Sequence, residues 1–188
     1  MLGQIHSPRL LLRDVTLSDA QHLFELDQDP EVMRFLGGVR ADDSVDRMRT
    51  LLAERVGWYM KTPGLGLGAC FLHSPAAISA AEFIGWFMLR PRKYRAYDAS
   101  GALLEPLEDA ELGYRLARRF WGRGYATEMS IALVRHGLEQ LALPRIVAFV
   151  DAEHAASARV LQKAGLSRVG RARYEAEDVE LYRAAASS

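Results

Sequence analysis

The chain has 188 residues, of which 49% are hydrophobic and 26% are charged, and this composition is that of an ordinary folded globular protein. Lysine plus arginine and aspartate plus glutamate number 24 each, so the net charge gives no reason to expect nucleic acid or an anionic membrane surface as a partner. The single cysteine, Cys70, excludes an intrachain disulfide, and its apolar neighbours indicate a small buried side chain.

The hydropathy pattern also disfavours a membrane-spanning protein and a secreted protein. No stretch approaches the roughly 18 apolar residues that cross a membrane, and the first residues lack the basic-then-apolar pattern of a signal peptide. We therefore expect a cytoplasmic protein with no membrane partner, built as a single domain over residues 1–188. The five histidines show no ligand spacing, and with one cysteine they predict no metal site.

The first sixty residues predict one strand followed by helices. A short apolar run with charged ends indicates a strand at 9–13, and a helix with one apolar face follows over 16–27. A second helix begins at Pro30 and stops before two glycines, because proline is tolerated at the first helical position. Asp42 and Asp43 are expected to cap a longer helix whose apolar residues recur at spacings of three and four.

The middle of the chain predicts two strands and one irregular stretch. The strands are expected at about 67–73 and 81–89, joined by a turn rich in serine, proline and alanine. Residues 90–108 contain two prolines and a Ser-Gly pair. They are either a mobile loop beside an active site or a plain hairpin extension, and the sequence leaves both open.

The last eighty residues alternate strand and helix before closing with two strands. The expected elements are a strand at 110–116, a helix at 124–141, a strand at 145–150, a helix at 153–165, and strands at 167–174 and 178–183. The unit over 110–166 implies a right-handed crossover, and the hairpins around it make the sheet mixed. The polar residues of the helix at 124–141 form one narrow stripe, on which Glu128 is expected to be solvated.

Small residues stand at the turn between the strand at 110–116 and the following helix. The turn reads Arg119-Phe-Trp-Gly122-Arg-Gly124-Tyr-Ala-Thr127. Glycines at such a turn let a phosphate reach backbone N–H groups at a helix N-terminus, where the helix dipole also favours anions. With Arg118 and Arg123 close by, the pattern predicts a phosphate-binding turn, which we call the cradle.

This pattern resembles the acetyl-CoA-binding core of the GCN5-related N-acetyltransferases (GNAT), in which the turn reads Gln/Arg-x-x-Gly-x-Gly/Ala. Other segments resemble the RimJ/RimL-like branch, which acetylates the N-termini of ribosomal proteins. The resemblance covers about residues 8–184. The segments that carry it are Pro8-Arg-Leu-Leu-Leu-Arg-Asp, Asp29-Pro-Glu-Val-Met, Phe83-Ile-Gly-Trp-Phe, Glu111-Leu-Gly-Tyr and Asp178-Val-Glu-Leu-Tyr. The resemblance implies an α/β (α+β) fold whose splayed, mixed, mostly antiparallel sheet has about seven strands and four to five flanking helices.

The resemblance also implies a cofactor site. The pantetheine arm would pair with the strand backbone near 114–117, and the pyrophosphate would lie on the amides of 119–126. The cofactor-binding residues implied are Leu116, Ala117, Arg118, Arg119, Gly122, Arg123, Gly124, Tyr125, Ala126, Thr127, His154 and Ser157.

Two positions depart from the family pattern. Many members carry asparagine where this chain has His154, whose imidazole could still hydrogen-bond the cofactor. Many relatives place a tyrosine in the last helix to protonate the leaving thiolate, and Leu161 occupies that position here. A tyrosine acid at that position is therefore excluded, and water or another group must serve.

Glu111 is the candidate catalytic residue. It lies on the strand that family members use to hold the thioester, where a carboxylate could accept a proton from an amine, directly or through water. The alternative is a structural ion pair with a nearby arginine. The sequence leaves both open.

The resemblance implies transfer of acetyl from acetyl-CoA to a primary amine, with a protein N-terminal α-amine of ribosomal-protein type as one acceptor. The alternatives are acetylation of a small-molecule amine, such as an aminoglycoside or polyamine, and a CoA-binding regulatory module without catalysis. The expected partners are acetyl-CoA and the amine acceptor, and a homodimer stays open as the assembly.

Overall fold

The computed structural model describes residues 1–73, 81–98, 100–174 and 177–186. These residues form two compact units, of which unit 1 comprises Met1–Met88 and Tyr114–Met129, and unit 2 comprises Leu89–Gly113 and Ser130–Ser188. Three elements, the strands β4 and β5 and the helix α4, pass from one unit into the other. The expectation of a single domain stays a prediction.

Unit 1 contains the strands β1 (Gln4–His6), β2 (Leu10–Asp14) and β3 (Gly66–Leu72) and the first part of β4 (Phe83–Ala96). The first three pair antiparallel, with β2 between its neighbours. Strand β2 was predicted at 9–13 and is confirmed, and its three leucines are buried on both faces. Strand β1 was not predicted, because its three residues are too few to show a two-residue period. The expected turn before β4 lies outside the described residues.

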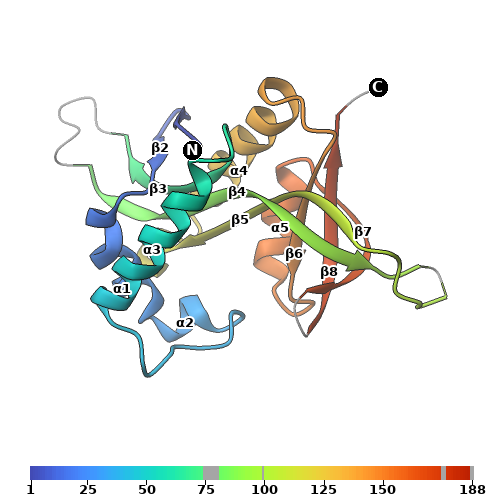
Figure 1. Ribbon diagram of the computed structural model, residues 1–188, viewed down its shortest axis with the longest axis horizontal. Coiled ribbons are helices and arrows are strands. Elements are labelled where there is room, and N and C mark those ends of the chain that lie inside the picture. Colours follow the sequence, from blue (N-terminus) through green and yellow to red (C-terminus); the bar gives the residue numbers. More distant parts are fainter. Residues whose placement is uncertain (74–80, 99, 175–176, 187–188) are drawn as a thin grey trace. The chain divides into compact units, whose positions relative to one another are not determined.

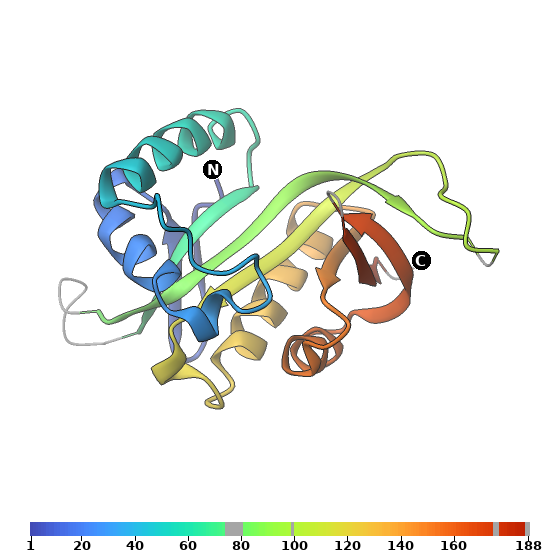
Figure 2. The same cartoon turned by 90° about the horizontal axis from the view of Figure 1, so that it is seen from below.

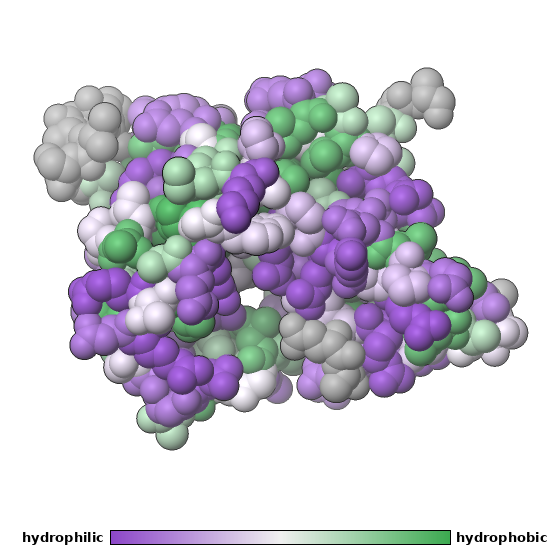
Figure 3. All heavy atoms as spheres, in the orientation of Figure 1, coloured by the Kyte–Doolittle hydropathy of each residue, from purple (hydrophilic) through white to green (hydrophobic). Residues whose placement is uncertain are grey.

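Helices α1 (Ala20–Asp27) and α3 (Val45–Tyr59) confirm the sequence pattern. Helix α2 (Pro30–Met33) begins at Pro30 as predicted but ends before the expected stop at the two glycines. Figures 1 and 2 show α1 and α3 side by side over one face of the strands, and hydrophilic side chains predominate over these helices in Figure 3. The predicted cap of α3 was wrong. Ser44, in extended conformation, accepts the hydrogen bond from the Arg47 N–H, whereas Asp42 and Asp43 pair with the Arg47 guanidinium.

The core of unit 1 lies between α1, α3 and the strands. Leu52 on α3 is fully buried, and so is Cys70 on β3. Burial raises the pKa of the Cys70 thiol, so this side chain stays protonated and packs as a small apolar residue, as predicted.

Unit 2 contains the end of β4, the first part of β5 (Leu107–Leu116), β6 (Arg145–Val150), β7 (Ser167–Tyr174) and β8 (Glu177–Ala185). The pairs β4–β7, β6–β8 and β7–β8 are antiparallel, whereas β5 and β6 run parallel through Ala110↔Ile146. The strands follow the hydrogen-bonded order β1-β2-β3-β4-β5-β6-β8-β7. The mixed, mostly antiparallel sheet is confirmed, with eight strands in the described residues where about seven were expected.

The stretch at 90–108 is a hairpin extension rather than a loop. Strand β4 continues to Ala96, β5 begins at Leu107, and a bridge joins Tyr97 to Leu103. Asp98 closes the turn, since its Oδ1 accepts hydrogen bonds from the Ser100 N–H at 2.8 Å and the Ala102 N–H at 3.0 Å. The charged side chains of this strand hid its apolar period in the sequence. The long ribbon is visible in Figure 2.

Two helices follow β5 in the chain. Helix α4 (Tyr125–Arg135) continues into a π-helical turn (His136–Gln140), and α5 (Ala155–Lys163) leads to β7. The predicted helix at 124–141 is confirmed in extent, but its last turn is wider than an α-helix. No helix in the described part of the chain is long and apolar enough to span a membrane.

Candidate functional site

The cradle forms a sharp connection between β5 and α4 in unit 1. Strand β5 ends at Leu116, and a short 3-10 turn (Arg118–Phe120) follows. The Trp121 indole N–H donates to the Leu116 carbonyl at 2.8 Å, which ties the turn back to the end of the strand. Helix α4 then begins at Tyr125.

Gly122 and Gly124 take positive φ angles of 73° and 80°. A side chain at either position would strain the backbone, so the sequence needs glycine here. Positive-φ glycines on either side of one residue can turn successive N–H groups toward one side, an arrangement that forms an anion-binding concavity. Within the described residues, no hydrogen bond is donated by the Gly122, Arg123 or Gly124 N–H, and all three residues are exposed. These amides, at a helix N-terminus, fit a diphosphate.

Positive charge surrounds the cradle. Arg118, Arg119 and Arg123 are exposed. The Arg119 guanidinium lies 4.6 Å from the centre of the Phe120 ring, and its Nε is 3.2 Å from Glu82 Oε1. A half-exposed ion pair of this kind is weak, so Arg119 can turn toward an anion at little cost.

Glu128 is not solvated, and the prediction was wrong. Its Oε1 accepts from the Ser7 hydroxyl at 2.7 Å and the Arg9 N–H at 2.8 Å, and its Oε2 accepts from Arg9 Nε at 2.6 Å. The side chain is 14% exposed. Burial opposes its ionisation, but the hydrogen bonds from Ser7 and Arg9 outweigh burial, and the pKa of Glu128 is lowered. Helical periodicity finds the polar stripe but cannot reveal that the turn between β1 and β2 contacts Glu128.

Glu111 lies on β5 in unit 2 and is 4% exposed. Its Oε2 accepts from Arg90 Nε at 2.9 Å and lies 3.8 Å from Arg92 Nε. Tyr174 joins the group, because its hydroxyl is 3.2 Å from Arg90 Nη2 and its ring is 4.2 Å from the Arg92 guanidinium. The ion-pair alternative is therefore confirmed as a contact, while the role of Glu111 as base stays a prediction.

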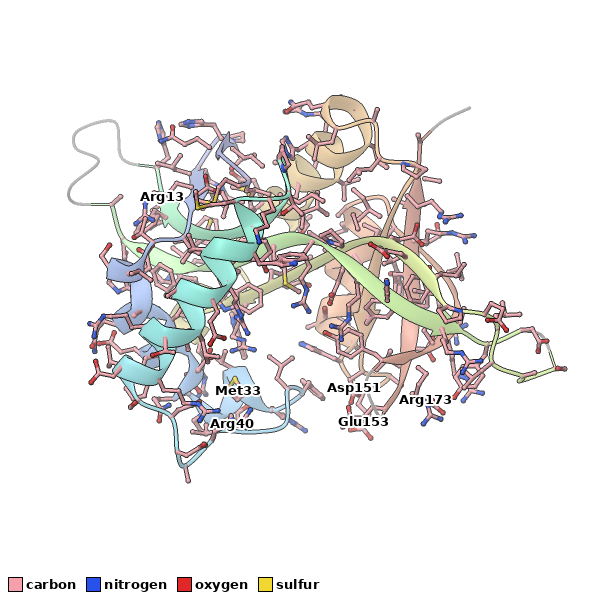
Figure 4. All side chains as sticks on the ribbon, viewed as in Figure 1. Arg13, Met33, Arg40, Asp151, Glu153 and Arg173 are labelled. Carbon is pink, nitrogen blue, oxygen red and sulfur yellow. The ribbon has the colours of Figure 1, made fainter. Side chains whose placement is uncertain are left out.

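His154 and Ser157 stand at the start of α5 in unit 2. The His154 N–H donates to the Asp151 carbonyl at 2.9 Å, and its own carbonyl accepts from the Ala158 N–H at 3.2 Å. Figure 4 labels Asp151 and Glu153 in this turn, where the Asp151 side chain accepts from the Glu153 N–H at 2.7 Å. The backbone of His154 is thus held by the turn, and its contact with cofactor stays a prediction.

Leu161 is 1% exposed and packs in the core. No tyrosine hydroxyl can act from that position, as expected from the sequence.

The structure brings together the predicted cofactor residues from Leu116 to Thr127 within unit 1. Glu111, His154 and Ser157 belong to unit 2. The sequence did not reveal that Ser7 and Arg9 are the partners of Glu128. It also did not reveal that Arg90, Arg92 and Tyr174 form the group around Glu111. Within the described residues, no group of three or more His, Cys, Asp or Glu side chains could hold a metal ion.

Similarity to known proteins agrees with this geometry. The family profile described as "Acetyltransferase (GNAT) domain" matches residues 9–167. The chain is 28% identical over 167 residues to the FsC-acetyl coenzyme A-N(2)-transacetylase of Aspergillus fumigatus, covering 88% of this chain and 65% of that protein. It is 27% identical over 170 residues to the uncharacterized N-acetyltransferase YoaA of Bacillus subtilis, covering 90% and 86%.

A solved structure shares the fold. RimL, the ribosomal L7/L12 α-N-protein acetyltransferase, in complex with coenzyme A, matches with a TM-score of 0.74 at 19% sequence identity, covering 97% of this chain and 98% of that one. At this identity the match speaks for the fold alone.

Proposed function

This chain belongs to the GNAT acetyltransferases, a family of acetyl-CoA-dependent N-acetyltransferases, and from this premise we propose that it acetylates a primary amine. The observation that carries the proposal is the cradle. Gly122 and Gly124, both at positive φ, lie beside three arginines at the start of α4, and their N–H groups donate no hydrogen bond to the described part of the chain. This combination suits the diphosphate of acetyl-CoA better than a carboxylate or a neutral ligand, because a diphosphate accepts several N–H bonds at once.

Bound acetyl-CoA supplies an activated acetyl thioester. The chain's own residues must then remove a proton from the acceptor amine and keep water away from the reacting atoms. Glu111 is the carboxylate we propose for proton acceptance, directly or through water. Its burial favours this role, because a group with little access to solvent transfers a proton only to what is bound beside it. Arg90 would hold its carboxylate in place.

A side-chain nucleophile is not part of the proposal. Cys70 is fully buried on β3, and burial raises the pKa of its thiol, so it supplies little thiolate. Direct attack of the amine on the thioester is the mechanism proposed.

For the acceptor we propose a protein N-terminal α-amine, on the resemblance of the segments at 8–14 and 111–114 to the RimJ/RimL-like branch. The second candidate is a small-molecule amine. The name of the Aspergillus fumigatus relative, an N(2)-transacetylase, favours it.

A thiol-release assay tests both candidates. Purified protein and acetyl-CoA are incubated with peptides beginning with serine or alanine, with the same peptides blocked at the N-terminus, and with aminoglycosides and polyamines. Release of CoA thiol only with free-amine peptides supports the first acceptor, and release only with small amines supports the second. The proposed function is contradicted if wild-type protein binds acetyl-CoA but none of the tested amines causes release of CoA thiol.

A further inference from the structure

The turn between β1 and β2 reaches the cradle through one side chain. The Arg9 Nε donates a hydrogen bond to Glu128 Oε2, and its Nη1 donates to the Arg123 carbonyl at 3.1 Å. The Arg9 guanidinium also lies 4.5 Å from the centre of the Tyr125 ring. One planar group therefore spans from the first turn of α4 back to the peptide between the two glycines.

This contact fixes the direction of an amide. The Arg123–Gly124 peptide is trans, like every described peptide of the chain, so its C=O and N–H point in opposite directions. Because Arg9 holds the carbonyl oxygen, the Gly124 N–H points away from Arg9. On the other side of Gly124, its own carbonyl accepts the Glu128 N–H at 3.0 Å, the first bond of the helix. Both peptides flanking Gly124 are thus held.

Glycine makes such a restraint necessary. Gly124 is required for its φ of 80°, but a residue without a Cβ also leaves the neighbouring peptides free to rotate. A rotated Arg123–Gly124 peptide would present a carbonyl oxygen, rather than an N–H, to an anion. The turn is exposed, so packing supplies little of the restraint.

We propose that Arg9 and Glu128 are positioning residues for the cofactor: Glu128 anchors Arg9, and Arg9 orients the Arg123–Gly124 peptide so that the Gly124 N–H donates to the cofactor diphosphate. This inference rests on the proposed function. It assigns a role in cofactor binding to the turn between β1 and β2, which lies outside the acetyl-CoA-binding segment at 110–166.

The test compares Arg9, which directly precedes β2, with Arg13, which lies on β2. The contacts of Arg9 with Glu128 and with the Arg123 carbonyl are together called the brace, and Arg9→Met removes them. Arg13→Met is the matched control, because Arg13 pairs with Asp19 at 2.7 Å, lies 4.6 Å from the centre of the Phe71 ring and is labelled on β2 in Figure 4. Calorimetry with CoA is expected to give an increase in Kd of about tenfold for Arg9→Met, equivalent to about 1.4 kcal/mol. Arg13→Met is expected to lower the melting temperature and change Kd by less than about twofold.

Arg9→Lys separates positioning from stability. A lysine can pair with Glu128 but has no planar fork to reach the Arg123 carbonyl at the same time. We expect it to keep the melting temperature, to raise the Kd for CoA nearly as much as Arg9→Met, and to raise KM for acetyl-CoA while kcat at saturation is unchanged. It also serves if Arg9→Met fails to fold.

The outcomes distinguish the two proposals. If wild-type protein binds CoA and the Arg9 variants bind it equally well, or if Arg9→Met and Arg13→Met weaken it equally, the brace is wrong and the proposed function stands. If the Arg9 variants weaken CoA binding as expected but no amine is acetylated by wild type, the proposed function is wrong and the brace stands. Wild-type protein that binds no CoA contradicts both.

Discussion

The cradle is exposed and presents backbone amides held by two glycines, whereas Glu111 is 4% exposed and presents a side chain to Arg90 and Arg92. The first region depends on backbone conformation and positive charge, so it is sensitive to changes that alter φ, remove an arginine or add negative charge. The second depends on the identity of each partner, because removing one member of a buried ion pair leaves the other uncompensated. The two regions therefore respond to different substitutions, and each can be tested separately.

The largest effect is expected at the buried region. Glu111→Gln keeps the size of the side chain and removes its basicity. If Glu111 is the base, turnover falls by roughly 10²–10⁴-fold, affinity for acetyl-CoA changes little, and the rising acid limb of the pH–rate profile disappears. Steady-state kinetics across pH measures all three.

The control is Asp109→Asn on the same strand. Asp109 is also buried, and its carboxylate accepts from Tyr94 Oη at 2.7 Å and Arg145 Nε at 2.8 Å. Loss of this group should lower stability and leave turnover nearly normal in the folded fraction. If Glu111→Gln behaves like Asp109→Asn and keeps more than about half of the wild-type turnover, Glu111 is not the base and its role is the ion pair alone.

The second effect is expected at the cradle. Gly122→Asp puts a carboxylate against the diphosphate and should raise the Kd for acetyl-CoA by well over about tenfold, more than ~1.4 kcal/mol. Calorimetry on the folded variant measures this change.

Gly101→Asp is the matched control for backbone strain. Gly101 has a φ of 86°, close to the 73° of Gly122, and at both positions an added Cβ would meet no atom within 4 Å. Both variants pay the same conformational cost, but Gly101 lies at the tip of the hairpin. Equal affinity of the two variants for acetyl-CoA would remove the cradle assignment.

A smaller effect is expected at His154. If its imidazole replaces the usual asparagine as a cofactor contact, His154→Ala should raise KM for acetyl-CoA by about threefold to tenfold, the loss of one hydrogen bond, without unfolding. If it only packs at the start of α5, the melting temperature falls and KM does not. His136→Ala, in the π-helical turn, controls for loss of a partly exposed histidine.

The smallest effect is expected from the acid titration of Glu128. The folded-state pKa of this carboxyl is lowered, chiefly by Ser7 and Arg9 against the opposing effect of burial. Its contribution to the free energy of unfolding is therefore complete above the ordinary carboxyl pKa and is lost as pH falls through the lowered value.

Urea titrations of wild type and Glu128→Gln measure this contribution. The difference in free energy of unfolding is expected to be about 1 kcal/mol at pH 7, because Arg9 is half exposed, and to shrink toward zero in acid. A difference that is constant from pH 7 to pH 3 would mean that charge at Glu128 does not contribute.

Backbone chemistry made the cradle predictable. Two glycines at fixed spacing, arginines beside them and a following apolar helix period together indicated the turn. Strand β6 was also predicted to the residue, because it is a short apolar run that directly follows Pro144. The predicted bounds of β7 match as well, and this strand directly follows Gly165 and Leu166.

Contacts between distant segments could not be predicted. The Ser7 and Arg9 partners of Glu128 lie 121 and 119 residues away in the sequence, and those of Glu111 lie on β4 and β7. A single sequence contains the charges but not their pairing. The hairpin at 90–108 was left open for a related reason, since its strand character depends on pairing with β5 and β7.

Arg9 and Glu128 are 119 residues apart in the sequence, and this separation has a consequence for how the protein folds. During synthesis Arg9 leaves the ribosome before Glu128 and cannot contact it until residue 128 has also emerged. Contacts of such sequence separation form late, because loop closure is entropically costly. The segment at 110–166 should therefore not be transferable to another scaffold as an autonomous coenzyme-binding module, and deletion of the first nine residues should weaken coenzyme binding although it removes nothing from that segment.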